Sequence, residues 1–126
     1  SYRKKKRTTA DEKKYPMAGA ITGVCEKKER LIRFGYVTIE PEQGQEGLLR
    51  QGEQIRGHEF HYFDSTNNGC DCIAGKPVGK RSWTCIHADR SHFIGFPHLY
   101  YPSCPDFVIN FVEQCRNWNR KRKGAK

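Results

Sequence analysis

The segment Arg56-Gly57-His58-Glu59-Phe60-His61-Tyr62 is the most informative stretch of this 126-residue chain. It lies within residues 54–63, a run that combines Ile, Phe and Tyr and is followed by a cluster of turn-forming residues at 64–69. Aromatic and β-branched residues favour strands, and clustered Asp, Asn, Ser and Gly favour turns. The pattern therefore predicts a β-strand over residues 54–63.

Side chains of a strand alternate between its two faces, so Glu59 and His61 should share one face and His58 and Phe60 the other. A carboxylate beside an imidazole can fix the tautomer of the histidine, as base catalysis and metal binding both require. Zinc would need a third ligand from elsewhere in the chain. A histidine that is merely hydrogen-bonded at a sheet surface explains the spacing equally well, so all three interpretations stay open.

The segments on either side of this strand also favour β-structure. Strands or extended segments are predicted at residues 18–23, 31–40, 70–74, 83–88 and 93–101. Residues 26–30 are expected to form a turn and residues 41–53 a loop, and residues 75–80 should connect a hairpin. Gly35 is expected to mark a bulge or a close backbone approach.

The last element has a different period. Apolar side chains recur with helical spacing at Val108, Phe111, Val112, Cys115 and Trp118. Pro105 and Asp106 are typical of a helix start, which predicts an amphipathic helix over residues 106–118. We expect this apolar stripe to pack on the sheet, which gives a fold of mostly mixed or antiparallel strands closed by one helix.

The formal charge of +9 is concentrated at the two ends of the chain. Residues 1–14 contain seven of the 23 Lys and Arg residues and residues 116–126 contain six, which leaves ten basic against twelve acidic side chains in residues 15–115. We therefore expect one domain over residues 15–118, between a disordered basic tail at 1–14 and a second basic tail at 119–126. No basic patch with interleaved aromatics lies in the middle, so nucleic acid is not the expected partner.

The six cysteines show no C-x-x-C pairs, so the sequence predicts no structural metal site and favours reduced thiols that fill core positions. No segment approaches the roughly 20 apolar residues of a membrane-spanning helix. A cytoplasmic protein without membrane contact is the expectation.

His98 lies in the apolar and aromatic setting Gly95-Phe96-Pro97-His98-Leu99-Tyr100-Tyr101. A histidine in such a setting is expected to be desolvated and neutral near pH 7, which suits a general base. A hydrogen-bonded core histidine would show the same pattern. No serine or cysteine lies in a recognisable nucleophile elbow, and no phosphate-binding loop is present.

Several of these segments, in order, resemble the second half of the glutaminase domain of cobyrinic acid a,c-diamide synthases. The matching segments are Tyr15-Pro16-Met17-Ala18-Gly19, Leu31-Ile32-Arg33-Phe34-Gly35-Tyr36, Ile55-Arg56-Gly57-His58-Glu59-Phe60-His61-Tyr62, Gly75-Lys76-Pro77 with Gly79-Lys80-Arg81-Ser82-Trp83, and Gly95-Phe96-Pro97-His98-Leu99-Tyr100. The resemblance implies an α/β fold, the C-terminal part of a class I type, flavodoxin-like glutamine amidotransferase domain. In the full enzyme this domain is attached to an ATP-binding synthetase domain.

The resemblance also implies a reaction. In this family a cysteine attacks the side-chain amide of glutamine, a thioester forms, and the ammonia passes to a carboxylate that ATP has activated. A histidine near the C-terminus acts as the base, and His98 matches it. The family residues that correspond to His58, Glu59, His61 and Tyr62 would shape the site, no carboxylate is assigned as a third catalytic member, and no metal ligand is implied.

The family's nucleophilic cysteine would lie before residue 1, so we expect this polypeptide alone to release no ammonia from glutamine. We expect no cofactor in this chain, with ATP and Mg²⁺ bound by the synthetase domain. Expected partners are glutamine, cobyrinic acid in the full enzyme, the rest of the same polypeptide, and a second copy paired through exposed sheet edges.

Two alternatives to this function stay open. The acceptor could be another tetrapyrrole, such as a sirohydrochlorin or sirohaem acid, because the glutaminase half does not contact it. Alternatively, the chain could be a non-enzymatic module whose basic tails bind nucleic acid or an acidic partner.

Overall fold

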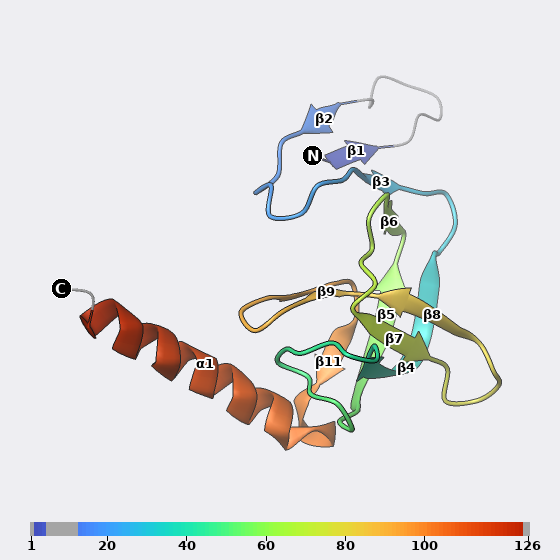
Figure 1. Ribbon diagram of the computed structural model, residues 1–126. Helices are drawn as coiled ribbons and strands as arrows, with labels where there is room; N and C mark the ends of the chain where they lie inside the picture. Colours follow the sequence, from blue (N-terminus) through green and yellow to red (C-terminus); the bar gives the residue numbers. More distant parts are fainter. Residues whose placement is uncertain (1, 5–12, 125–126) are drawn as a thin grey trace.

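The computed structural model describes residues 2–4 and 13–124 (Figure 1). A five-stranded antiparallel sheet has the order β11-β5-β4-β7-β8. Its strands are β4 (Arg33–Pro41), β5 (Ile55–His61), β7 (Cys72–Gly75), β8 (Ser82–Cys85) and β11 (His98–Tyr100). The central pair β4 and β5 confirms the two strands that the sequence predicted most clearly, and β7 and β8 confirm the hairpin.

A smaller four-stranded sheet has the order β2-β1-β3-β6. Its strands are β1 (Tyr2–Lys4), β2 (Lys14–Tyr15), β3 (Cys25–Lys27) and β6 (Phe63–Ser65). The pair β1 and β3 is parallel, and the other pairs are antiparallel. A two-stranded ribbon of β9 (His87–Ala88) and β10 (Phe93–Ile94) completes the β-structure. The predicted mixture of mostly antiparallel strands with one C-terminal helix is thereby confirmed.

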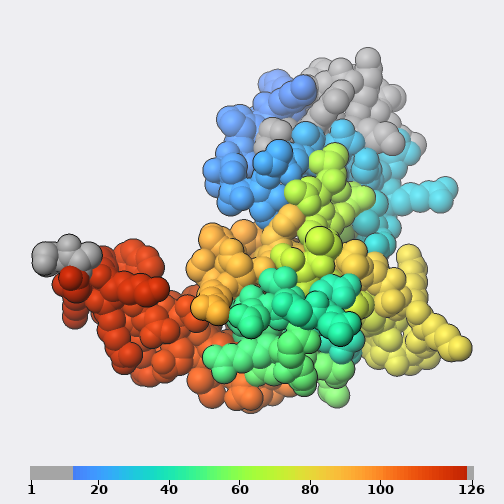
Figure 2. Space-filling view, viewed as in Figure 1, coloured from blue at the N-terminus to red at the C-terminus, as the bar shows by residue number. Residues whose placement is uncertain are grey.

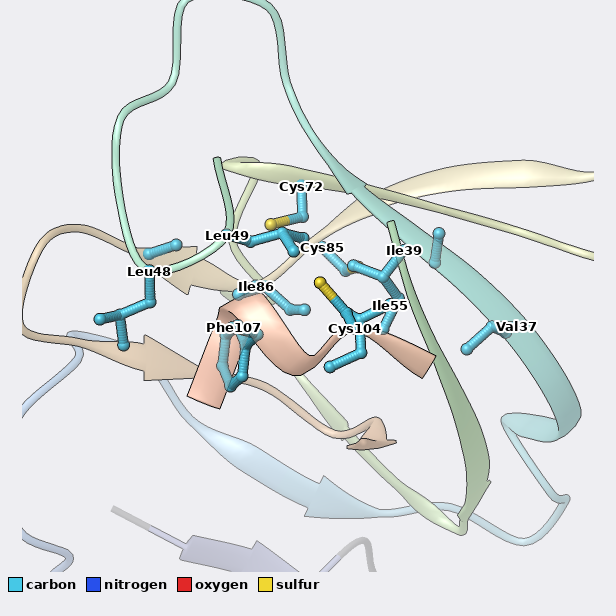
Figure 3. Close-up of a cluster of buried hydrophobic side chains, with 12 residues drawn as sticks. Val37, Ile39, Leu48, Leu49, Ile55, Cys72, Cys85, Ile86, Cys104 and Phe107 are labelled. Carbon is cyan, nitrogen blue, oxygen red and sulfur yellow. The ribbon is translucent and has the colours of Figure 1, made fainter. Parts of the chain in front are cut away.

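The hydrophobic core lies on one face of the five-stranded sheet (Figure 3). Val37, Ile39 and Ile55 project from β4 and β5, and the loop between these two strands adds Leu48 and Leu49. Further buried residues are Cys72, Ala74, Cys85, Ile86, Ala88, Cys104 and Phe107. Three of the six cysteines therefore fill core positions as free thiols, as the sequence predicted.

The helix α1 (Pro105–Gly124) begins at the predicted proline, after the short 3-10 helix η1 (Tyr101–Ser103). The predicted packing of its apolar stripe is wrong. Val108, Phe111, Val112, Cys115 and Trp118 are all exposed, and only Phe107 and Asn110 of α1 are buried. Figure 2 shows the helix, in orange and red, extending away from the body of the molecule.

The physical reason is that another segment already covers the sheet. Leu48 and Leu49 occupy the core beside Phe107, so only the first turns of α1 contact the body. The Asn110 side chain donates a hydrogen bond of 2.9 Å to the Leu48 carbonyl and anchors the helix to this loop. The part of α1 after Asn110 does not cover the sheet.

The expected tails also differ from the structure. Residues 119–124 continue α1, because Arg and Lys favour helices and their charge is stabilised near the helix C-terminus. In the expected N-terminal tail, Tyr2–Lys4 forms β1, while residues 1 and 5–12 lie outside the described residues. Residues 2–4 are thus a strand and residues 119–124 are part of a helix, and the division into one domain with two basic tails stays a prediction.

Three further expectations need correction. Residues 18–23 form no strand and are mostly exposed, since Gly19 has a positive φ of 75° that interrupts an extended chain. Part of the turn expected at residues 26–30 is strand β3, which pairs with both β1 and β6. The segment 93–101 is divided into β10 and β11, with Pro97 between them, because proline cannot donate to a sheet ladder.

Gly35 forms no bulge, because its pairing with Glu59 continues the register between β4 and β5. Its φ is +107°, a backbone conformation that residues with a side chain rarely adopt. A Cβ at this position would lie 3.2 Å from Lys76 Nζ. In the part of the chain that the structure describes, none of the helices could serve as a membrane span.

Candidate functional site

The predicted site residues lie on two opposite faces of β5. In the sheet register His58 pairs with His98 of β11 on one side and with Tyr36 of β4 on the other. Directly paired residues of an antiparallel sheet share a face. His58 and His98 therefore lie side by side, on the face opposite to Glu59 and His61.

The face that carries the two histidines is rich in aromatic rings. We call it the aromatic face and define it as Phe34, Tyr36, His58, Phe60, Tyr62, His98 and Tyr100. The His58 ring meets those of Tyr36 and Phe34 edge-on, with centroids 5.4 and 5.9 Å apart. All members except His58 are exposed, and Tyr36 is exposed at 72%. Monomeric proteins rarely expose contiguous apolar patches of this kind without a binding role.

His98 is exposed on this face, which corrects the prediction of a desolvated imidazole. The apolar neighbours in the sequence do not enclose it, because β11 is an edge strand and the alternation of the chain directs Leu99 inward instead. The same strand borders a cavity of about 340 Å³ that is also lined by Phe93 and Tyr101. His98 is thus open to solvent on the aromatic face.

On the opposite face, Glu59 and His61 meet as the alternation predicted. Glu59 is only 3% exposed, and its Oε1 lies 3.3 Å from His61 Nε2. The other ring nitrogen, Nδ1, lies 2.6 Å from the Phe63 carbonyl oxygen. The Phe96 ring stacks on the imidazole at 4.1 Å with an interplanar angle of 9°. The sequence offered no signal for this stacking, since residues 61 and 96 are brought together only by the fold.

The hydrogen bonds limit the pair of Glu59 and His61 to two possible arrangements of protons. A carbonyl oxygen only accepts, so His61 Nδ1 must carry a hydrogen and donate it to Phe63. The contact between Nε2 and Glu59 Oε1 is then a hydrogen bond only if one proton lies between these two atoms. The pair is either an imidazolium with a carboxylate or a neutral imidazole with a carboxylic acid.

Two neighbouring thiols lie in the core, and one of them, Cys85, is close enough to Glu59 to be affected by its charge. Cys72 and Cys85 are cross-strand partners of β7 and β8, and both are buried. Burial raises the pKa of each thiol to about 12, with the neighbouring Cys85 adding to the shift at Cys72 and Glu59 adding to the shift at Cys85. Neither thiol can supply a thiolate nucleophile near neutral pH.

Alkylation should distinguish these thiols from the exposed ones. With iodoacetamide at pH 8, Cys70 and Cys115 are expected to react within minutes, while Cys72 and Cys85 stay unmodified, because only the thiolate reacts. Peptide mass spectrometry reads out each site. All six cysteines should react after denaturation in guanidinium, and modification of Cys72 or Cys85 in the native protein at the rate of Cys70 would contradict the buried pair.

Metal binding has no support in the described part of the chain, where no three His, Cys, Asp or Glu side chains are grouped to hold an ion. The open zinc interpretation of Glu59 and His61 therefore lacks its third ligand among these residues. His87 and His92 lie outside both faces and contact the Asn67 carbonyl and the Asp89 carboxylate respectively.

No family model and no solved structure matches this chain. Each of the following three similar proteins is named a cobyrinate a,c-diamide synthase. The chain is 28% identical to that of Caldanaerobacter subterraneus over 110 residues, 32% identical to that of Listeria innocua over 102 residues, and 29% identical to that of Priestia megaterium over 119 residues.

These matches cover 86%, 77% and 93% of the chain, but only 24%, 22% and 25% of the three relatives. The resemblance to cobyrinate a,c-diamide synthases is thereby confirmed over most of the chain. The chain spans about a quarter of the length of these relatives.

Proposed function

We propose that this chain is the histidine-bearing, C-terminal part of a glutamine amidotransferase domain in a cobalamin-biosynthesis enzyme of the cobyrinate a,c-diamide synthase type. The domain would be of the flavodoxin-like class I type. It would hydrolyse glutamine and supply ammonia for the ATP-dependent amidation of the a and c carboxylates. The observation that carries the proposal is the exposed His98, held beside His58 on an open aromatic face, in a chain similar to these synthases.

His98 would act as the general base and then as the general acid. It would take the proton of a cysteine thiol, and the thiolate would attack the side-chain amide carbon of glutamine. It would then return the proton to the departing nitrogen, so that ammonia leaves and a thioester remains for water to hydrolyse. His58 is a positioning residue in this scheme, because it pairs with His98 across the strands and is itself held by the Tyr36 and Phe34 rings.

We propose that the remainder of a larger protein covers the exposed apolar surfaces of this chain. The aromatic face and the apolar stripe of α1 are both uncovered within the described residues, and the relatives are about four times longer than their matched segments. Covering the aromatic face would exclude water from His98, which strengthens electrostatic interactions at a reacting amide. Contact with the rest of the larger protein would therefore complete the site around His98 and bury the aromatic face.

The role of His98 can be tested in a chimera. Residues 15–118 would replace the matching segment of the Listeria innocua cobyrinate a,c-diamide synthase. His98→Asn is expected to lower glutamine-dependent amidation about 10²–10⁴-fold, the usual contribution of a positioned acid–base group. Amidation with free ammonium chloride should be unchanged, because that route needs no glutamine hydrolysis.

The matched control is His92→Asn, which removes an exposed histidine outside both faces and should change neither rate. Equal glutamine-dependent rates for His98→Asn and the unmodified chimera would disprove the proposed role of His98. Ammonia-dependent activity verifies that each chimera is folded.

A further inference from the structure

Ile86 has a backbone conformation that its own side chain makes costly. Among the described residues it is the one residue with a side chain whose φ is positive, at 68°. The two branches at its Cβ crowd the backbone there, so β-branched residues almost never adopt this conformation. Such strain persists only where the surrounding structure enforces it, and it gathers at functional sites. Ile86 is therefore a candidate for a role beyond core packing.

The segment 68–71 holds the Ile86 backbone from both sides. The Ile86 N–H donates a hydrogen bond of 2.8 Å to the Asn68 carbonyl, and the Ile86 carbonyl accepts one of 3.0 Å from the Asp71 N–H. Gly69 lies so close that a Cβ at this position would overlap the Ile86 carbonyl group. These contacts fix the φ of Ile86 in the left-handed region.

The left-handed conformation changes the direction of the Ile86 side chain. Ile86 follows Cys85, the last residue of β8, and strand alternation would place these two side chains on opposite faces. Both are buried instead, with Cys85 6% and Ile86 1% exposed, and Figure 3 shows them together in the core. The strained residue thus brings a second consecutive side chain into the interior.

Inside the core, the Ile86 side chain packs against the segment that leads into β11. A Cβ at Gly95 would lie 2.8 Å from Ile86 Cγ1, so the side chain abuts the backbone of residue 95. Ile86, Gly95, Pro97 and His98 all line the cavity of about 340 Å³ beside β11. The ring of Pro97 restricts the backbone between Gly95 and His98. A shift of residue 95 is therefore transmitted to the histidine.

Strand β11 depends on such support because it is short and lies at an edge. It has three residues and, among the described strands, it pairs with β5 alone. We propose that Ile86 is a positioning residue for His98, which fixes residues 95–97 and thereby holds the imidazole beside His58. The effect of Ile86 on catalysis rests on the proposed function, whereas its effect on the position of β11 does not.

Hydrogen exchange tests the positioning on the chain itself. Ile86→Ala removes the carbons that contact Gly95, so the amides of β11 should exchange about tenfold faster relative to those of β4. A loss of global stability alone would not raise this ratio, because it would act on β4 at least as strongly. Ile86→Val keeps both branches at Cβ and should retain the ratio of the unmodified chain.

Leu49→Ala is the matched control. It removes the same number of carbons from a residue that is 2% exposed and does not line the cavity beside β11, so it should leave the exchange ratio unchanged. An equal ratio in Ile86→Ala and Leu49→Ala, or a raised ratio in Ile86→Val, would overturn the proposal. If Ile86→Ala does not fold, Gly95→Ala decides. Its Cβ would press on Ile86 Cγ1 from the other side and should raise the same ratio, and an unchanged ratio would sink the idea.

The chimera described above adds a catalytic readout. Ile86→Ala should lower kcat for glutamine-dependent amidation about tenfold, with KM for glutamine and the ammonium-dependent rate unchanged, because a displaced acid–base group slows the chemical step. An unchanged kcat in Ile86→Ala, in a chimera that His98→Asn inactivates, would contradict the positioning of His98 by Ile86. If His98→Asn itself has no effect, the proposed function fails, and the exchange ratio still decides whether Ile86 holds β11.

Discussion

Replacing Phe107 with alanine should destabilise the chain by about 3–5 kcal/mol, the usual cost of removing a buried phenylalanine. Phe107 is 6% exposed, and its ring lies edge-on to Phe93 at 5.0 Å and parallel to Tyr101 at 6.2 Å. These contacts are the main apolar connection between α1 and the body. Equilibrium unfolding in urea, followed by tryptophan fluorescence and circular dichroism, measures the change.

Phe111 provides the matched control one helical turn further along. It is 52% exposed, so Phe111→Ala should change the free energy of unfolding by less than about 0.5 kcal/mol, as is usual for surface positions. If both substitutions had the same cost, α1 would be packed along its whole apolar stripe. That result would restore the packing that the sequence predicted and would contradict the structure.

Gly57→Ala is expected to separate β11 from β5 and to displace His98. A Cβ at position 57 would lie 2.9 Å from the His98 carbonyl oxygen, a backbone atom that can move only with its strand. Overpacking of this kind typically costs about 1–3 kcal/mol. Urea unfolding gives the loss of stability, and the imidazole signals of His58 and His98 report the loss of their pairing.

Gly75→Ala is the control for this experiment. Gly75 lies in β7 of the same sheet, and a Cβ there would meet no atom within 4 Å. It should therefore leave the histidine signals and the unfolding midpoint nearly unchanged. Unchanged pairing of the two histidines in Gly57→Ala would show that β11 does not lie against β5 as the structure has it.

Local patterns were sufficient for the parts of the fold that depend on near neighbours. Alternation in β5 placed Glu59 and His61 on one face, and the hydrogen-bonded contact at 3.3 Å confirms it. The start of the helix at Pro105 could be predicted because the effect of proline at this position is confined to the first turn. The two central strands and the hairpin followed from β-branched and aromatic runs between turn residues.

Features that depend on distant residues were not predictable in this way. The apolar stripe of α1 indicated a helix but not its partner, because Leu48 and Leu49 of a polar-looking loop occupy the core beside it. The exposure of His98 depends on the position of β11 at the edge of the sheet, which no local pattern encodes. The stacking of Phe96 on His61 is a contact between segments 35 positions apart in the sequence.

The histidine-bearing strand, the alternation of its faces, the start of the helix and the resemblance to cobyrinate a,c-diamide synthases could therefore be read from the amino-acid sequence alone. Only the fold shows which of the two faces is buried, which apolar groups are covered, and that His98 lies beside His58. The reason is that backbone geometry and side-chain alternation act over a few residues. Burial and pairing depend on the segments that the whole fold brings together.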